Sequence, residues 1–472
     1  MKKRIGIVGG GISGLTAAYI LHRDYADICE FTLFEAKNRL GGIVETIHAD
    51  GFTMECGPDS WVTEKPWFEQ LARELGLAHD LLPSNDRERR TYIARAGSLA
   101  ALPDSMRMMV PTDLNAVLDS PFFTESAKQG YLAEPARAVE LRETALLNRG
   151  VDADESVAAF VRRHFGDEVV DTVAGPLLAG IFGGDVEKLS ARALLGPLVA
   201  LEADHGSLIT GIAERGRTSA VPVFTTLASG LGVLVDRLQQ SLPLSSIRLS
   251  SPVLGVHSLP TGWILETAHG AERFDRILIA TSLDITRQLL SSLESGEAQR
   301  AATLLPAEAA SGLVVALGYG AQSKPAPAIP KGFGLLVAAR ATVNHSLLAC
   351  TFLHQKFSGR APDGATLLRA FFASSAADEL SRRSDGEIAG IARNQLIEFL
   401  GPLPEQADVT IVRHWPRSLP QYEIGHVARM EKFKTCLSAL DRVTVAGNAF
   451  RGVGLPDLVR DATQTAHALA RD

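Results

Sequence analysis

RIGIVGGGISG, residues 4–14, is the stretch of sequence that decides the fold. The run Arg4–Val8 predicts a short buried strand, and the glycines that follow it predict a tight turn. Beyond the turn, apolar residues recur at helical spacing, and Phe31–Phe34 predicts a second strand. This order of strand, glycine turn, helix and strand is typical of a unit that binds dinucleotides.

The glycines of the turn have separate physical roles in such a unit. Gly9 permits the tight turn out of the strand, Gly11 lets backbone N–H groups approach a pyrophosphate, and Gly14 lets the helix pack closely on the strand. Ile12 and Ser13 begin the helix, whose positive N-terminal end points at the same anion. Without further support, however, this motif is a weak signal.

Glu35 supports the interpretation, because it ends the predicted second strand, 21 residues after Gly14. A carboxylate at this place accepts hydrogen bonds from both hydroxyls of a ribose and disfavours a 2′-phosphate. The alternative is an unrelated surface glutamate beside a glycine turn.

Composition and length restrict the class of protein. The chain has 472 residues, 46% of them apolar, and a formal net charge of −7. These values predict a globular protein of two or three domains without a nucleic-acid partner. The four cysteines are scattered, which predicts neither a disulfide framework nor a metal site and favours a reducing cytoplasm. We expect no signal peptide and no transmembrane helix, although surface attachment to a membrane stays open.

The fold class predicted along the chain is α/β, with a Rossmann-like nucleotide-binding domain that is split in sequence. Its closing part is a strand at Val443–Ala446, a turn at Gly447, Gly452 and Gly454, and a helix near residues 456–470. Helical periodicity fills the middle of the chain, and strand signals resume after it, with a proline-rich loop at Ser323–Gly332. The predicted boundaries are 1–90, 225–290 and 435–472 for the nucleotide-binding domain, 104–205 for a helical domain, and 91–103, 206–224 and 291–434 for a mixed-sheet, substrate-binding domain.

The segment Glu35–Gly42 resembles the FAD-dependent amine oxidase and phytoene desaturase superfamily. The resemblance implies FAD as the cofactor, with Arg39 reaching its phosphates and Gly41-Gly42 passing close to the flavin. It also implies that Val253 contacts the adenine through its backbone. The alternatives are a solvated loop charge for Arg39, a simple turn at the two glycines, and a core residue at Val253.

A more specific resemblance, to the protoporphyrinogen and coproporphyrinogen oxidases, spans nearly the whole chain in order. The stretches that carry it are Gly51–Ser60, Tyr92–Arg95 with Leu102-Pro103, Phe165–Val170, Leu178–Asp185 with Lys188–Ser190, Gly332–Leu336, Leu419–His426, and Ala446–Asn448 with Gly452–Asp457.

This resemblance implies the oxidation of protoporphyrinogen IX to protoporphyrin IX in haem biosynthesis. The six electrons would leave in three hydride transfers to flavin N5, with molecular oxygen as the final acceptor. Coproporphyrinogen III, oxidised by the same chemistry to coproporphyrin III, is the alternative substrate. Two other hypotheses are an amine- or carotenoid-type flavin oxidase and a non-catalytic FAD-binding scaffold. An amine- or carotenoid-type oxidase would require an aromatic pair beside the flavin. The retained flavin-facing glycines argue against a non-catalytic scaffold.

Site residues follow from the matching motifs. Gly180 matches a glycine whose carbonyl faces the reacting ring, and Leu336 and Phe357 match apolar residues that sandwich the macrocycle. A helix-packing glycine and two ordinary core residues are the alternatives. The residues expected around the flavin are Gly57, Pro58, Gly447, Val453, Gly454 and Leu455, of which the last two begin a helix that points its positive end at the flavin.

One departure from the pattern concerns the substrate anchor. Where several family members have a propionate-binding arginine, this chain has Thr91, so Arg90 or Arg95 is the candidate, unless the charges around Arg90 are simply solvated. The resemblance also implies a peripheral membrane protein on the inner face of the membrane. Met106–Pro111 and Phe122-Phe123 are candidate anchors that could equally pack internally. A homodimer stays open.

Overall fold

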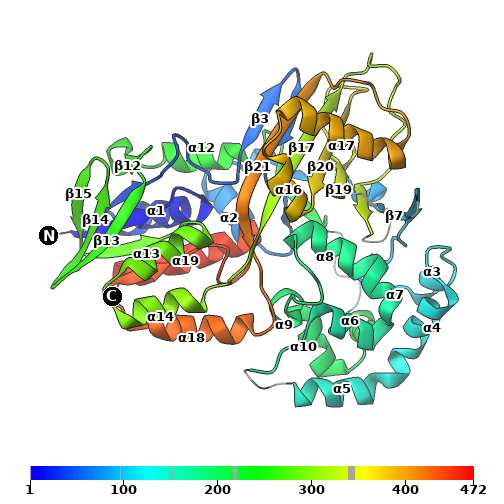
Figure 1. The fold of residues 1–472 in the computed structure, drawn as a ribbon, viewed down its shortest axis with the longest axis horizontal. Helices are drawn as coiled ribbons and strands as arrows, with labels where there is room; N and C mark the ends of the chain where they lie inside the picture. The colour runs from blue at the N-terminus through cyan, green and yellow to red at the C-terminus, as the bar shows by residue number, and fades with distance from the viewer. Residues whose placement is uncertain are drawn as a thin grey trace.

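The computed structural model describes residues 2–95, 97–148, 150, 152–215, 221–338 and 346–471. Two large sheets lie side by side (Figure 1). The first contains strands from both ends of the chain, and the second lies beside a layer of helices. The carboxyl ends of the strands of the first sheet and one face of the second form the candidate site described below.

The first sheet has five parallel strands in the order β12-β2-β1-β16-β22. Its members come from three distant parts of the chain: β1 (Lys3–Val8), β2 (Cys29–Phe34), β12 (Ile247–Arg248), β16 (Arg276–Ile279) and β22 (Val443–Val445). The strands expected at both ends of the chain are therefore present, and β16 joins them.

Both faces of this sheet are covered, as in other parallel sheets. Ile5 and Ile7 of β1 pack against one set of helices, namely α1 (Ile12–Tyr25), α2 (Trp67–Glu74), α12 (Gly232–Gln240) and α19 (Leu455–Arg471). Val8 points to the opposite face. That face is covered by the strands β13 (Val253–Leu259), β14 (Gly262–Thr267) and β15 (Gly270–Phe274) and by the helices α13 (Leu283–Ser292), α14 (Gly296–Leu304) and α18 (His426–Ser438).

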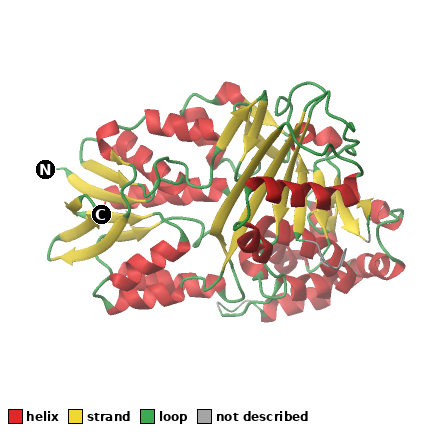
Figure 2. Ribbon diagram, turned by 45° about the horizontal axis from the view of Figure 1, so that its top comes forward, coloured by secondary structure: helices red, strands yellow, loops and turns green. Residues whose placement is uncertain are grey.

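The second sheet has seven strands in the order β21-β17-β20-β19-β18-β7-β8. Only the pairing of β7 with β18 is parallel among those of the described residues. The strands are β7 (Thr91–Arg95), β8 (Ser98–Ala101), β17 (Ala309–Tyr319), β18 (Gly334–Val337), β19 (Leu347–Phe352), β20 (Thr366–Phe372) and β21 (Val409–Pro420). The helices α16 (Ser374–Leu380) and α17 (Asp385–Leu400) cover one face (Figure 2).

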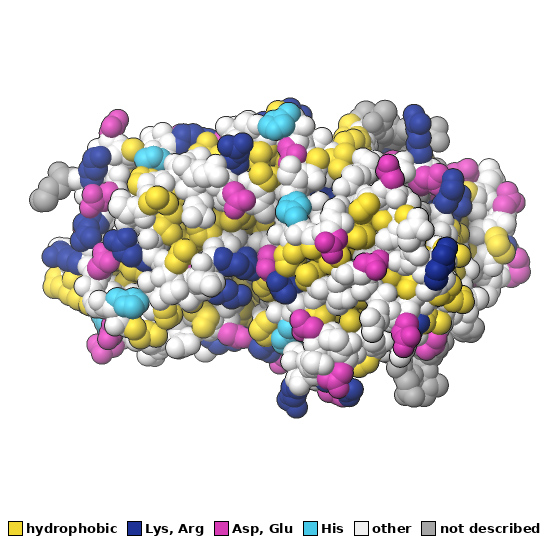
Figure 3. All heavy atoms as spheres, turned by 90° about the horizontal axis from the view of Figure 1, so that it is seen from above, with side chains coloured by type: hydrophobic (Ala, Val, Ile, Leu, Met, Phe, Trp, Pro, Cys, Tyr) yellow, Lys and Arg dark blue, Asp and Glu magenta, His cyan; other side chains and the backbone are white. Residues whose placement is uncertain are grey.

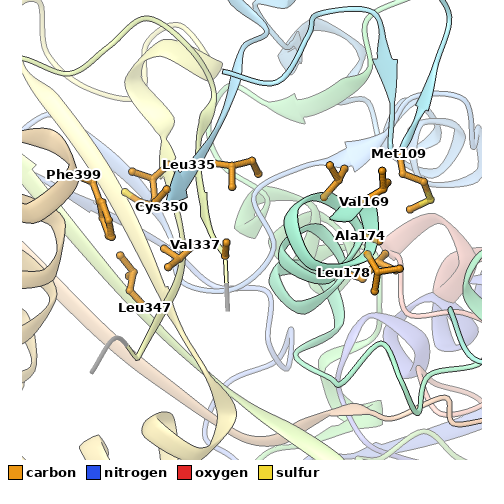
Figure 4. Packing of buried hydrophobic residues seen from close by; sticks show 14 of the residues in the cluster. Met109, Val169, Ala174, Leu178, Leu335, Val337, Leu347, Cys350 and Phe399 are labelled. Atoms are coloured by element: carbon orange, nitrogen blue, oxygen red, sulfur yellow. The ribbon is translucent and has the colours of Figure 1, made fainter. Parts of the chain in front are cut away.

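A layer of helices lies against the other face of this sheet. It comprises α3 (Leu114–Leu118), α4 (Glu125–Ala133), α5 (Ala138–Leu147), α6 (Val157–Phe165), α7 (Asp167–Val169), α8 (Gly175–Phe182), α9 (Ala191–Leu194), α10 (Gly196–His205) and α11 (Leu208–Glu214). Figure 4 shows the two sides: Leu335, Val337 and Cys350 gather with Phe399 of α17, whereas Ala174 and Leu178 lie in the helical layer. A π-helical turn at residues 170–174 joins α7 to α8, and such turns are frequent at functional sites.

The smaller elements connect the two large sheets. A hairpin of β3 (Thr46–Ala49) and β4 (Phe52–Glu55) follows the first helix unit. A small sheet of β5 (Trp61–Val62), β11 (Phe224–Leu227) and β6 (Leu81–Pro83) lies beyond it. The loop expected at Ser323–Gly332 lies between β17 and β18, as predicted.

The candidate membrane anchors pack internally. Met109 and Val110 are 0% exposed, and Phe122 and Phe123 are each 4% exposed, within the core shared by the helical layer. Met108 alone of these two segments is an exposed large apolar residue, so the interpretation of the segments as surface anchors is wrong. Apolar residues next to a cation look alike in a core and on a membrane-binding surface.

Other large apolar side chains of the helical layer are exposed, among them Val139, Leu146 and Leu147 of α5. No helix of the described residues is both long enough and apolar enough to cross a bilayer. On the face shown in Figure 3, acidic and basic side chains are interspersed with apolar ones.

Candidate active site

Two glycine turns meet where the parallel strands end. Gly9, after β1, has a φ of +108°, and a Cβ on it would lie 2.3 Å from the carbonyl oxygen of Ala280, which follows β16. Gly447, after β22, has a φ of +142° and lies beside Thr281. Ligands of open α/β sheets bind at this carboxyl edge. The structure thus brings the two ends of the chain together at one site.

The space in front of α1 fits a pyrophosphate. A Cβ on Gly14 would lie 1.9 Å from the carbonyl oxygen of Gly9, so this glycine is required for packing the helix. A Cβ on Gly11 would meet only the Cα of Gly42, at 4.0 Å, and therefore points into open space. The N-terminus of α1, at Ile12 and Ser13, has no side-chain cap. Its backbone N–H groups remain available to an anion.

The Gly41-Gly42 loop lies against this turn. Gly41 has a φ of +97° and donates its backbone N–H to the Gly10 carbonyl oxygen at 2.8 Å. The terminal nitrogens of Arg39 donate to the carbonyl oxygens of Leu40, Gly42 and Val44 of the same loop. Arg39 therefore shapes the loop, and its predicted contact with phosphates stays a prediction.

Glu35 lies where the sequence placed it, just after β2. Its carboxylate accepts backbone N–H groups from Gly10 at 2.7 Å and from Lys37 at 2.8 Å. A carboxylate has about four acceptor positions, so two remain for ribose hydroxyls. The backbone N–H of Ser251 also donates to the Glu35 carbonyl oxygen at 2.9 Å. Val253 follows Ser251 by two residues in the chain and is therefore held near this site.

The Gly57-Pro58 loop lies between the two sheets. A Cβ on Gly57 would lie 2.0 Å from the Ile43 carbonyl oxygen, so only glycine fits against the Gly41–Val44 loop. Trp415 of β21 donates its indole N–H to the Cys56 carbonyl oxygen at 2.7 Å. Burial raises the pKa of the Cys56 thiol to about 11, which keeps it protonated and unreactive at neutral pH.

A buried ionic group that sequence reasoning missed holds this loop. Asp59 accepts hydrogen bonds from Lys356 at 3.0 Å and from Arg369 at 2.9 Å, and Arg369 also donates to the Gly57 carbonyl oxygen. The side chains of the two cations are 10% and 1% exposed. Burial alone would raise the pKa of Asp59, but the charges of Lys356 and Arg369 outweigh it and hold that pKa well below its usual range. These residues are about 300 positions apart in sequence, and no local motif announces them.

The start of α19 closes the dinucleotide site. Val453 and Gly454 are partly exposed in front of this helix, and Leu455 begins it within the core. Asp457, in the first turn, forms an ion pair with Lys65 at 2.6 Å. The positive end of the helix dipole therefore faces the same edge of the sheet as the N-terminus of α1.

A row of paired residues crosses the face of the seven-stranded sheet that meets the helical layer. Strand register makes neighbours of Ile93, Leu336, Ala349, Phe371 and Val314, in this order. Paired residues share a face of a sheet, so these side chains form one apolar wall. At its far end, Phe371 packs with Val314 and Cys56, beside the Gly57-Pro58 loop.

Gly180 of α8 faces the middle of this wall. A Cβ on it would lie 3.3 Å from Cδ2 of Leu336 and 3.9 Å from Cβ of Ala349. Gly180, Leu336 and Phe371 all keep some exposure, although they lie between two packed layers. The structure thus brings Gly180 and Leu336 into contact, and their roles toward a substrate stay predictions.

Phe357 does not belong to this wall. Its side chain is 0% exposed, in a cluster with Phe52 and Met54 of the β3–β4 hairpin. The prediction that Phe357 and Leu336 sandwich a substrate is therefore wrong, because Phe357 has no surface to offer. Phe371, in contrast, belongs to the wall and keeps some exposure, as the strand register reveals.

The two candidate arginines lie at opposite ends of β7: Arg90 directly precedes the strand and Arg95 ends it. Arg95 is two residues beyond Ile93 and shares its face, and its guanidinium donates to the Phe122 carbonyl oxygen at 3.0 Å. Arg90 is exposed, and its closest partners, Tyr92 and Asp104, raise its pKa. The structure brings Arg95, but not Arg90, to the face that carries Leu336.

The fold and the glycine turns together define a protein that binds an adenine dinucleotide beside a second, apolar site. More particularly, the chain belongs to the flavin containing amine oxidoreductase family, whose model matches residues 12–470. The chain is therefore a flavin-dependent oxidoreductase, and its cofactor is FAD, as the sequence predicted.

Individual relatives are similar over almost their whole length. The chain is 30% identical to coproporphyrinogen III oxidase of Bacillus subtilis (strain 168), covering 97% of this chain and 96% of the relative. It is 28% identical to protoporphyrinogen oxidase 1, chloroplastic, of Spinacia oleracea, covering 98% and 83%. Among solved structures, the "Putative protoporphyrinogen oxidase" of Exiguobacterium sp. 255-15 superposes with a TM-score of 0.83 at 32% identity, covering 100% and 99% of the two chains.

Proposed function

We propose that the chain oxidises a porphyrinogen to a porphyrin with FAD, and that its substrate is coproporphyrinogen III. The observation that carries this proposal is the apolar wall of Leu336, Ala349 and Phe371, which faces Gly180 and leads to the Gly57-Pro58 loop. A large macrocycle with an apolar body is the kind of substrate that such a wall would contact.

The reaction requires little of the side chains beyond positioning the substrate. When bound, FAD supplies the hydride acceptor, so the hard step belongs to the cofactor. The residues of this chain orient the macrocycle against the wall and exclude water from it. The row named above contains no titratable side chain, which agrees with a reaction that needs no general acid or base from it.

Two further features of the chain suit a redox cofactor. The N-terminus of α19 presents a positive dipole end near Val453 and Gly454, where it would favour negative charge on a reduced cofactor. The ion pairs of Asp59 hold the Gly57-Pro58 loop rigidly in place. Rigid supports of this kind keep reacting groups within productive geometry.

The choice of substrate rests on the names of relatives. The sequence interpretation put protoporphyrinogen IX first, but the relative at 30% identity is a coproporphyrinogen III oxidase, and we therefore reverse the order. Protoporphyrinogen IX remains the second candidate, because a protoporphyrinogen oxidase is 28% identical. The two compounds differ by two propionates, so the cations around the wall decide between them.

The test uses the purified flavoprotein with each porphyrinogen in air. We expect porphyrin fluorescence to rise with coproporphyrinogen III, and three molecules of peroxide to form for each porphyrin. Faster turnover of protoporphyrinogen IX would overturn the substrate, but not the reaction. Protein that holds FAD and oxidises neither compound would overturn the proposed function.

For the propionate anchor, we propose Arg95 because it shares the face of the wall. Arg95→Gln should raise KM for the porphyrinogen, and Arg90→Gln, which changes an exposed arginine just before the same strand, is the matched control. Equal effects of the two substitutions would remove Arg95 from this role. The division into domains, a cytoplasmic location at the inner face of the membrane, and a homodimer all stay predictions.

A further inference from the structure

A second hollow of the molecule lies away from the apolar wall. It is a groove of about 460 Å³ between α18 and α19, which we term the α18–α19 groove. Its sides are residues of these two helices, its floor is β22, and its end is the loop at Phe450, Arg451 and Gly452. Figure 1 shows α18 and α19 on the side of the molecule that holds the five-stranded sheet.

One end of the groove is aromatic and polar. The rings of Tyr422 and His426 are stacked there, with centroids 3.8 Å apart. The hydroxyl of Tyr422 donates to the Asn448 carbonyl oxygen and accepts the backbone N–H of Gly452 at 3.1 Å, so its hydrogen bonds are made. Those bonds fix the loop that ends the groove.

His426 closes this end of the groove. Its side chain is 2% exposed, and both ring nitrogens are enclosed by protein, with the Phe450 carbonyl nearby. Burial and the neighbouring Arg429 lower its pKa to about 4, so the ring is uncharged at neutral pH. The stacked rings of Tyr422 and His426 therefore form an uncharged end wall.

The charges in the groove favour an anion. Arg192, Lys434 and Arg451 line it, against the two carboxylates Glu431 and Asp461. Arg451 pairs with Asp461 at 3.0 Å, but its own side chain is 51% exposed and can take a second partner. Arg451 adjoins Gly452, whose N–H binds Tyr422, so this cation and His426 lie at the same end.

The rest of the groove is apolar and narrow. Val427, Met430, Phe433 and Leu437 line it along α18, and Phe433 stacks with Phe450 at 5.3 Å. From His426 to Leu437 the helix rises about 16 Å. A volume of about 460 Å³ over that length gives a mean cross-section of roughly 30 Å². That is too narrow for a macrocycle and suits a single extended chain.

We propose that the α18–α19 groove binds a linear amphipathic carboxylate, such as a medium-chain fatty acid. Its carboxylate would accept hydrogen bonds from the half-exposed guanidinium of Arg451, and charge-assisted bonds of this kind are strong. Its alkyl chain would lie along Met430, Phe433 and Leu437, which removes apolar surface from water. This binding is independent of the proposed oxidation of a porphyrinogen.

The experiment measures binding of decanoate to the FAD-loaded protein by titration calorimetry. We expect one site, with decanol and decyltrimethylammonium binding at least about tenfold more weakly. Arg451→Gln should weaken decanoate binding by about tenfold or more, because the charged partner is lost. Ala468→Trp, at an exposed position that lines the groove, should fill the groove and abolish binding.

The matched control is Lys432→Gln, which changes an exposed cation of α18 whose partner, Asp152, lies outside the groove. It should leave decanoate binding unchanged, and the visible flavin spectrum reports that each variant is folded. The proposal is overturned if decanoate does not bind, or if both Arg451→Gln and Ala468→Trp bind it like the unmodified protein. Equal binding of decyltrimethylammonium would also overturn it.

Discussion

Gly11→Ala should separate cofactor binding from folding. The substitution adds a methyl group that meets no protein atom closer than 4.0 Å, and the φ of −73° at this position is open to any residue. The methyl group instead enters the space that we assign to the pyrophosphate. The protein should therefore fold without its cofactor and fail to hold it.

The magnitudes follow from opposing effects. Replacing glycine by alanine reduces the freedom of the unfolded chain and stabilises by about 0.4–1 kcal/mol. At the residue before a helix, alanine is less favourable than glycine by a similar amount. The free energy of unfolding without FAD should thus stay within about 0.5 kcal/mol of the original. Loss of one hydrogen bond to a charged phosphate costs about 1.5–3 kcal/mol, which is roughly a tenfold to hundredfold loss of FAD affinity.

Two other glycines serve as controls. Gly14→Ala places a Cβ 1.9 Å from the Gly9 carbonyl oxygen, so it should destabilise the protein itself by about 1–3 kcal/mol. Gly390→Ala, on α17, meets nothing within 4 Å and should stabilise the helix by about 0.5–1 kcal/mol without changing FAD affinity.

The assays are urea unfolding of the protein freed of FAD and a fluorescence titration with FAD. The reasoning would be refuted if Gly11→Ala bound FAD as tightly as the unmodified protein. It would also be refuted if Gly11→Ala lost as much unfolding free energy as Gly14→Ala.

Three more predictions concern other parts of the site. Glu35→Ala should weaken FAD binding by about 1.5–3 kcal/mol, with Glu35→Gln intermediate, and unchanged affinity in the same titration would contradict the ribose assignment. Phe371→Ala should lower kcat/KM for the porphyrinogen while the flavin spectrum stays intact. Phe357→Ala should instead cost about 3–5 kcal/mol of stability. The opposite pattern would indicate that Phe357, and not Phe371, contacts the substrate. The folded pKa of Asp59 is depressed, so its ion pairs stabilise fully above the unfolded pKa near 4 and are lost as the pH falls toward the folded pKa. The free energy of unfolding in urea, measured at a series of acidic pH values, should fall less steeply with decreasing pH for Asp59→Asn than for the unmodified protein. An equally steep fall would contradict this prediction.

The parts of the site that sequence analysis found are those with local signatures. Gly9, Gly11 and Gly14 lie within six residues, and each is dictated by backbone geometry that the motif itself creates. Glu35 is found because the end of the second strand is predictable from its apolar run.

Residues defined by register or by distant pairing were out of reach. Phe371 and Phe357 are similar in the sequence, and only the pairing of β20 with β17 and β19 places Phe371 in the row that contains Leu336 and Ala349. Lys356 and Arg369 meet Asp59 across almost 300 residues. For Met109 and Phe122 the sequence left membrane anchoring and internal packing open, because an apolar side chain carries no mark of whether protein or lipid will cover it.

The five-stranded sheet has a consequence for the order of events during synthesis. The glycine turn after β1 is among the first parts made, yet β16, which pairs with β1, and β22, which pairs with β16, follow some 270 and 440 residues later. A ribosome-bound chain that ends before β22 has neither Gly447 nor the start of α19 to close the dinucleotide site. Cofactor capture is therefore a late event, and a nascent chain must keep its first strands apart from other partners until the last strand arrives.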